Sequence, residues 1–320
     1  MRLILSILLF AWVVLETHAQ CCSGGVPMSG NIGLPAANKG TWQFSLNYDL
    51  NFLETLKAGS EVLDDRSRRR ETHSLLLESG YSITDRLSVD LFLSFVRQER
   101  TINPIGLPQD FVATQGLGDA VVLIKYAIWP KITAGFGMKL PTGASDRTRD
   151  SGLPLNADLQ PGSGALDQLL YLNYSTDVRF RPSMTVGSTV IHRFTGTNNS
   201  YLGSSSYRFG NETQVTASIA DRIAIGRLLL DPSLNLRLRI QGRDQFNNID
   251  FPSSGGTFLF INPGLAVVLN TKLSYQLNVA LPIYAHVNDT QLSPTYRINT
   301  GFFFTLPRKS QSQFIIPNVN

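Results

Sequence analysis

The stretch TWQFSLNYDLNF, residues 41–52, places an apolar side chain at every even position and a polar one at every odd position. Such strict alternation is typical of a β-strand whose two faces meet different surroundings. A strand in a globular protein usually runs about 5 to 6 residues, whereas a tilted strand needs about 9 to 11 residues to cross a bilayer. The length of this stretch therefore favours a membrane-crossing strand, with lipid on one face and a polar lumen on the other.

The same alternation recurs along the chain, in segments joined by links of two kinds. Short links are expected at residues 85–86, 129–130, 177–178, 221–222 and 270–271, and long ones at 54–72, 98–117, 141–165, 195–206, 243–256 and 287–295. A soluble lipocalin-type barrel also alternates, but it need not sort its loops by length. The pattern predicts an all-β fold, a transmembrane antiparallel up-and-down β-barrel of about twelve strands with short periplasmic turns and long extracellular loops.

The N-terminus carries the features of an export signal. Arg2 precedes an apolar run, residues 3–15, and Thr17-His18-Ala19 is a small-residue ending suited to cleavage after Ala19. This predicts a signal peptide over 1–19. Residues 20–38 are then a periplasmic segment or a lumen plug, 39–306 the barrel, and 307–320 a periplasmic tail. The expected location is the bacterial outer membrane, with outer-membrane lipid and lipopolysaccharide as partners.

Composition and cysteine content point to no other class of protein. The chain has 28 Lys plus Arg against 24 Asp plus Glu, a net charge of +4 and a mean hydropathy of -0.01. This mild basic excess indicates no particular partner, and the chain lacks the motifs expected of nucleic-acid binding. The adjacent Cys21 and Cys22 cannot staple the fold; the alternatives are a strained bond between the two, capping, lipidation, and pairing with another chain. The arginine run at 66–70 either meets lipopolysaccharide phosphates or is a solvated loop.

Charged side chains occupy the faces opposite the apolar ones, and we expect them to line the lumen. An Arg or Lys facing lipid at mid-depth would cost about 2–4 kcal/mol. A basic row in a lumen favours anionic or polar solutes. The alternative is that these charges pair with the lumen carboxylates and only hold the barrel together. The candidates are Glu78, Asp90, Asp119, Lys125, Lys139, Arg193, Arg208, Glu212, Arg237, Arg239 and Arg297.

Three passages carry a family resemblance: GLGDAVVLIKY at 116–126, KLPTGASD at 139–146 and DLQPGSGALDQLL at 158–170. They resemble the outer-membrane barrel family named after the meta-pathway of phenol degradation. The resemblance implies a channel or transporter for small hydrophobic or aromatic compounds, distantly like the outer-membrane fatty-acid transporters. Gly and Pro also punctuate ordinary loops, so these residues could simply shape the connections. The matching positions are Gly118, Asp119, Leu140, Pro141, Thr142, Gly143, Gly162, Gly164 and Asp167.

The sequence shows no constellation for catalysis, cofactor binding or metal binding. A nucleophile and its base would lie two residues apart on one strand face, whereas His73 and Ser74 are adjacent. Neither His192 nor His286 has a serine two residues away, and no group of His, Cys and carboxylates has metal-ligand spacing. We therefore expect no enzyme, no cofactor and no metal. The second hypothesis is a closed structural or surface-interaction barrel, and the sequence assigns no oligomeric state.

Overall fold

The computed structural model describes residues 33–34, 37–103, 106, 108–149 and 151–307. The predicted signal peptide, most of the segment 20–38 and the tail from 308 onward lie outside these residues. Among the described residues, no helix is long and apolar enough to cross a bilayer.

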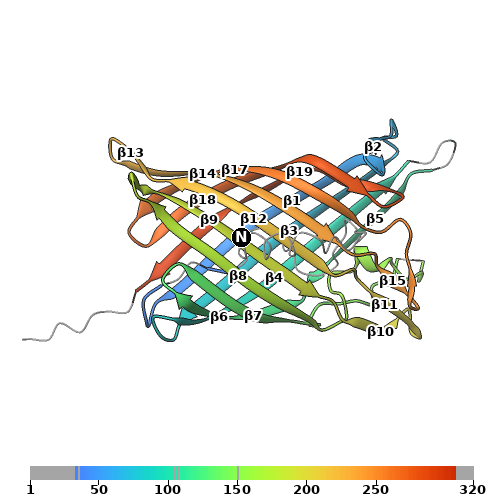
Figure 1. Ribbon diagram of the computed structural model, residues 1–320. Coiled ribbons are helices and arrows are strands. Elements are labelled where there is room, and N and C mark those ends of the chain that lie inside the picture. The colour runs from blue at the N-terminus through green and yellow to red at the C-terminus, as the bar shows by residue number, and fades with distance from the viewer. Residues whose placement is uncertain (1–32, 35–36, 104–105, 107, 150, 308–320) are drawn as a thin grey trace, which may run out of the picture.

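The described chain forms a closed antiparallel barrel of twelve tilted strands (Figure 1). Each strand pairs with its neighbours in chain order, and β1 pairs with β19 to close the cylinder. The predicted fold class and strand number are therefore confirmed. The barrel strands are β1 (Trp42–Ala58), β3 (Arg68–Ser82), β4 (Leu87–Ile102), β6 (Ala120–Trp129), β7 (Ile132–Leu140), β8 (Asp167–Val178), β9 (Arg181–Phe194), β12 (Glu212–Asp221), β14 (Leu228–Gln241), β17 (Gly256–Asn270), β18 (Leu273–Val287) and β19 (Thr290–Leu306).

Shorter elements decorate the two ends. At one end, β13 (Ile223–Ile225) pairs with the start of β14. At the other, β2 (Glu61–Val62) pairs with β1, and β5 (Asp110–Leu117) pairs with β4. A separate sheet of β10 (Thr197–Tyr201), β11 (Ser205–Arg208), β15 (Gln245–Phe246) and β16 (Ile249–Asp250) gathers at this same end (Figure 1). The 3-10 turn η1 (Ala157–Leu159) lies in the connection 141–166.

The end with the tight connections at residues 83–86, 130–131, 179–180 and 271–272 is called the short-turn rim, and the opposite end the long-loop rim. Two predicted links are wrong, and the link predicted at 177–178 lies two residues before the turn at 179–180. The link placed at 221–222 lies at Gly226-Arg227, because the hairpin extends through β13 and Gly226 supplies the positive φ of 60° that a tight turn needs.

The second wrong link is the long loop predicted at 287–295, which is a two-residue turn at Asn288-Asp289. Its polar residues belong to β19, where they pair with β1. The predicted loop at 54–72 is likewise shorter, since β1 and β3 leave only residues 59–67 between them. The connection between β18 and β19 is therefore as short as those of the short-turn rim, although it lies at the long-loop rim.

Alternation separates two kinds of surface on each wall strand. On β4, Leu91, Leu93 and Phe95 are exposed on the outside, whereas Asp90 and Ser94 are buried inside. The arrangement inverts that of a soluble protein, because apolar side chains face outward and polar ones inward. A closed barrel of this kind satisfies the backbone within lipid, which an open sheet cannot do.

Candidate functional site: the barrel lumen

The lumen contains a cavity of about 1060 Å³ that starts at the short-turn rim. Asp85 and Lys131 line it at the rim, and Glu78, Lys125 and Arg297 line its deep end. Small-ligand pockets usually occupy roughly 300–1,000 Å³. The cavity therefore has room for a small molecule together with water.

One wall of the cavity is a belt of amide side chains on adjacent strands. Asn235 on β14 lies opposite Asn262 on β17, and Asn278 on β18 lies opposite Asn299 on β19. Asn299 Nδ2 in turn donates to Asp49 Oδ2 on β1 at 3.3 Å. All five side chains line the cavity, so this wall offers both donors and acceptors to a solute.

The wall formed by β4, β6, β8 and β9 carries apolar side chains at the deep end of the cavity. Phe92 and Tyr171 line the cavity directly. They belong to a buried inner cluster with Val121, Leu123, Leu169 and Ile191. The cavity is therefore polar on one side and partly aromatic on the other.

Leu34, near the end of the predicted N-terminal segment, lies inside the barrel. Its N–H donates to Asp90 Oδ2 at 3.1 Å, and Lys125 Nζ donates to its carbonyl oxygen. Lys125 Nζ also pairs with Asp90 Oδ2 at 2.6 Å. Glu78 is buried beside this pair. Three of the predicted lumen residues thus form a charged group that receives the backbone of residue 34.

A second charged group forms where the family motifs meet. Lys139 Nζ lies 2.6 Å from Asp119 Oδ2, and both side chains are fully buried. The backbone N–H of Ser163 donates to the same carboxylate oxygen at 3.0 Å, and that of Gly143 donates to Oδ1 at 3.1 Å. We call these four residues the Asp119 cluster. It fastens both ends of the connection 141–166 to the barrel wall.

Glycines let the backbone approach closely around this cluster. A Cβ on Gly143 would lie 2.7 Å from Gly162 Cα, and one on Gly162 would lie 2.5 Å from Gly143 C. Thr142 Oγ1 accepts from Ala120 N at 2.8 Å and reaches Gly118 O at 3.3 Å. These motif residues therefore hold the connection against the wall, which loop-shaping alone does not explain.

The remaining motif positions lie at the edges of the same region. Asp167 begins β8, where its Oδ1 accepts from Gly196 N at 2.9 Å and its Oδ2 lies 3.3 Å from Lys139 Nζ. Gly164 has a positive φ of 67°, a backbone conformation that favours glycine. Pro141 follows the last residue of β7, Leu140, and is exposed.

A third charged group crosses three strands. Glu212 Oε2 lies 3.3 Å from Arg193 Nη2 and 3.1 Å from Arg239 Nη2, and Glu212 and Arg193 are fully buried. Arg297 Nη2 pairs with Asp49 Oδ1 at 2.7 Å. Ion pairing across the interior, the alternative raised from the sequence, is therefore extensive among the described side chains.

Two other predicted lumen residues, Arg237 and Arg208, lie in different parts of the fold. Arg237 is buried on β14, and its guanidinium lies 4.6 Å from the centre of the Phe260 ring. Arg208 is not on a barrel strand, because it lies on β11 of the small sheet at the long-loop rim. The prediction that Arg208 lies on the lumen wall was wrong. The alternating pattern did not distinguish β10 and β11, which pair with each other, from the strands of the barrel wall.

The connection 141–166 also packs against side chains of the barrel wall at the long-loop rim. Arg70 Nη1 pairs with Asp158 Oδ2 at 2.6 Å, and Gln98 Nε2 donates to Gln160 O at 3.0 Å. Leu159 is 1% exposed and packs with Val112. Three of the four arginines in the predicted run, Arg66, Arg68 and Arg69, are therefore exposed, whereas Arg70 is buried and points into the barrel.

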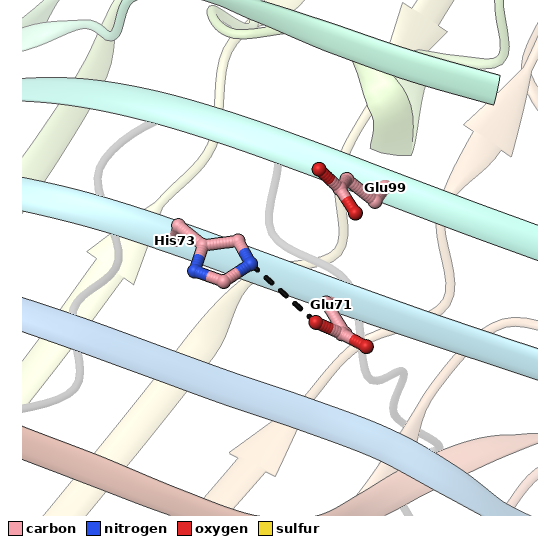
Figure 2. Close-up of side chains that lie close together, drawn as sticks. All are labelled: Glu71, His73 and Glu99. Atoms are coloured by element: carbon pink, nitrogen blue, oxygen red, sulfur yellow. Dashed lines mark ion pairs between the residues drawn. The ribbon is translucent and has the colours of Figure 1, made fainter.

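One group of metal-ligating type also occurs, on the outer wall. Figure 2 shows His73 and Glu71 on one strand facing Glu99 on the next. One ligand atom from each lies within 4.8 Å of the others. Linear spacing does not reveal this group, because strand pairing brings Glu99 of β4 beside Glu71 of β3. Both carboxylates already have arginine partners, Arg69 at 3.0 Å and Arg97 at 2.6 Å.

The fold and the enclosed cavity define a transmembrane β-barrel of the up-and-down class. Residues 65–293 match the model of the family described as "Putative MetA-pathway of phenol degradation", and the chain belongs to that family. The resemblance seen in the sequence is thereby confirmed. No curated protein matches the chain.

Among solved structures, an outer-membrane channel from Pseudomonas putida F1 shares the fold. It is 16% identical, with a TM-score of 0.64 over 88% of this chain and 100% of that one. The toluene transporter TodX of Pseudomonas putida covers 90% of this chain and 96% of its own, at 10% identity and a TM-score of 0.43. The latter likeness is too low to carry an argument.

Proposed function

We propose that the chain is an outer-membrane channel for small hydrophobic or aromatic compounds. The observation that carries the proposal is the lumen cavity of about 1060 Å³, which starts at one rim of a membrane-spanning barrel. A barrel that served only as a scaffold would need no such space. The amide belt suits water and polar groups, while Phe92 and Tyr171 offer aromatic faces to a ring.

The proposed channel is closed towards the long-loop rim in its resting state. The Asp119 cluster holds the connection 141–166 against the barrel wall, and Leu159 and Gln160 of this connection are buried. Buried ion pairs span the interior at the same height. This closure supports a gated channel over an open porin. A closed structural barrel, the alternative, would show the same closure, so the two functions are separated by experiment.

The segment 20–38 is proposed to be a lumen plug, since Leu34 is held between Asp90 and Lys125. Deleting residues 20–38 should raise the single-channel conductance slightly in planar bilayers, because Gly33, Leu34 and Ala37 line the cavity while the connection 141–166 still obstructs the opposite rim. Conductance equal to that of the full chain would mean that the segment does not obstruct the lumen.

The channel function itself is tested by uptake. Cells that carry the chain should take up a radiolabelled monoaromatic hydrocarbon faster than cells that lack it, because intact lipopolysaccharide slows the entry of apolar solutes. Equal uptake in the two strains, together with zero conductance of the purified barrel, would favour the closed structural barrel. His286 Nδ1 lies 2.9 Å from Ser60 Oγ, but this exposed pair does not line the cavity, so it gives no support to a catalytic role in the lumen.

Export by residues 1–19 and contact with lipopolysaccharide belong to the same proposal. Arg69 is half exposed on the outer wall near the long-loop rim, where lipid phosphates would be expected. Replacing Arg66, Arg68 and Arg69 with glutamine should weaken co-purification of lipopolysaccharide in a salt-dependent manner. Unchanged co-purification would assign these residues to a solvated loop.

A further inference from the structure

The side chains of Glu71, His73 and Glu99 gather on the outer wall, where β3 and β4 run side by side (Figure 2). Glu71 and His73 lie two residues apart on β3, so both point to the same face, and Glu99 of β4 lies directly opposite Glu71. One ligand atom from each residue lies within 4.8 Å of the others. Zn²⁺ binds such atoms at about 2.0–2.2 Å, so a small movement of the side chains would bring all three onto one ion. We call these three residues the outer-wall group.

The His73 ring has the orientation that a metal ligand needs. Its Nδ1 lies 2.7 Å from Tyr48 Oη on β1, and its Nε2 lies 3.5 Å from Glu71 Oε2. When Nδ1 carries the proton and donates it to the tyrosine oxygen, Nε2 presents its lone pair to the carboxylates. Metal-ligating histidines are normally fixed in this way, by an oxygen partner on the other ring nitrogen. Tyr48, which is outside the group, thus independently points to an ion at Nε2.

Two carboxylates in this group face each other across the strands, an arrangement that is unfavourable by itself. Glu71 and Glu99 form a direct cross-strand pair, and like charges in such a pair destabilise a sheet. Their side chains are only 20% and 24% exposed, so water screens the repulsion incompletely. A divalent cation between the two carboxylates would offset it.

The arginine partners of the two carboxylates do not exclude an ion. Arg69 Nη2 contacts Glu71 through Oε1 at 3.0 Å. Arg97 Nη2 likewise contacts Glu99 through Oε1 at 2.6 Å. A carboxylate has about four lone-pair sites on its two oxygens, so each retains the capacity to bind a metal. Both arginines are about half exposed, and ion pairs at such positions contribute little to stability.

The outer-wall group lies at the edge of the apolar band of the barrel. The rings of Trp42 and Tyr81 pack with centroids 4.6 Å apart near the short-turn rim, where an aromatic girdle marks the opposite edge of the band. Glu71 is ten residues from Tyr81 along β3. At about 3.4 Å per residue and a tilt of roughly 35–45°, this separation is about 24–28 Å across the membrane, against an apolar band about 25 Å tall. Dissolved ions would therefore reach the group from the aqueous side.

We propose that Glu71, His73 and Glu99 bind Zn²⁺ on the outer wall of the barrel. Imidazole nitrogen and carboxylate oxygen are ordinary zinc ligands, and three protein ligands leave a fourth position for water. Mg²⁺ and Ca²⁺ prefer oxygen ligands alone, so the imidazole favours zinc over them. The bound ion joins β3 to β4 beside the long-loop rim. The site stands apart from the proposed channel function, because it lies outside the lumen.

Titration of the purified full chain in detergent with Zn²⁺ tests the site. The protein is prepared without a histidine tag and with Cys21→Ser and Cys22→Ser, since thiolates also bind zinc. Isothermal titration calorimetry should show one Zn²⁺ bound per chain. His73→Gln and Glu99→Gln should each weaken the affinity by more than about tenfold. His192→Gln, which changes a histidine on β9, is the matched control and should leave the affinity unchanged.

Two further variants distinguish a metal site from a network of ion pairs. Tyr48→Phe should weaken zinc binding by about 10–100-fold, because His73 loses the partner that orients its ring. Arg69→Gln with Arg97→Gln should tighten zinc binding, because the competing cations are gone. Far-UV circular dichroism verifies that each variant is a folded barrel. If the chain binds no Zn²⁺, or binds it equally well after His73→Gln and Glu99→Gln, the outer wall holds no zinc site.

Discussion

Lys139 and Asp119 show how a single pair can hold a connection of the barrel. Both are fully buried, and Asp119 accepts two backbone hydrogen bonds from the connection 141–166 as well as the lysine. Lys139→Met should lower the free energy of unfolding by about 3–5 kcal/mol, because it leaves a buried carboxylate without its cation. The measurement is urea unfolding in lipid vesicles.

The double variant Lys139→Met with Asp119→Leu serves as the control for this pair. It should lose less than the sum of the two single variants, since neither charge is then left alone. If the loss in the double variant equalled the sum of the losses in the two single variants, the two side chains would not act as a pair.

Asp244 gives the loops at the long-loop rim a dependence on pH. It lies beyond the end of β14, fully buried, and accepts from Tyr207 Oη at 2.6 Å and from Gly210 N at 2.8 Å. Burial raises the pKa of its carboxyl group from 3.8 to about 7. The folded loops therefore hold a proton that the unfolded chain releases. Their stability should fall as the pH rises between these two values and then level off.

Limited proteolysis of the connections 195–211 and 242–255 measures this effect at either end of that pH window. Asp244→Asn removes the titrating group, so the ratio of cleavage rates between the original chain and this variant should rise with pH. A ratio that stays constant would assign the loops' pH response to other groups.

At the scale of elements, the connection 141–166 behaves as a packed part of the barrel. Leu159 is 1% exposed, whereas Leu153 in the same connection is 63% exposed. Leu159→Ala should cost about 2–5 kcal/mol through the cavity it leaves, loosen the connection and speed its cleavage by an added protease. Leu153→Ala is the matched control and should change neither. Equal cleavage of the two variants would mean that Leu159 does not anchor the connection.

The strands could be predicted from sequence because each wall strand meets two solvents, and alternation records that directly. The ends of strands were less predictable. Residues 290–295 are mostly polar and contain Pro294, so they read as a loop, yet pairing with β1 holds them in β19. The small sheet of β10, β11, β15 and β16 was missed because its strands are too short to alternate visibly.

The charged lumen residues were recognisable from their faces, but their partners were not. Lys125 meets Asp90 and Lys139 meets Asp119 only through the register between β4, β6 and β7. The family motifs drew attention to Asp119 and its neighbours. The hydrogen bonds that Asp119 accepts from Ser163 and Gly143 could be identified only in the folded structure.

For the whole molecule, the proposed function places two obstructions in series along one lumen. Gly33, Leu34 and Ala37 line the cavity, and the connection 141–166 closes the opposite rim. Because resistances in series add, removing residues 20–38 alone or shortening residues 144–161 to a Gly-Ser link alone should raise conductance only slightly. Removing both should raise it by more than the sum of the two single gains. If either single deletion alone gave the full conductance of the double deletion, the other segment would not obstruct the lumen, and the barrel would have one gate.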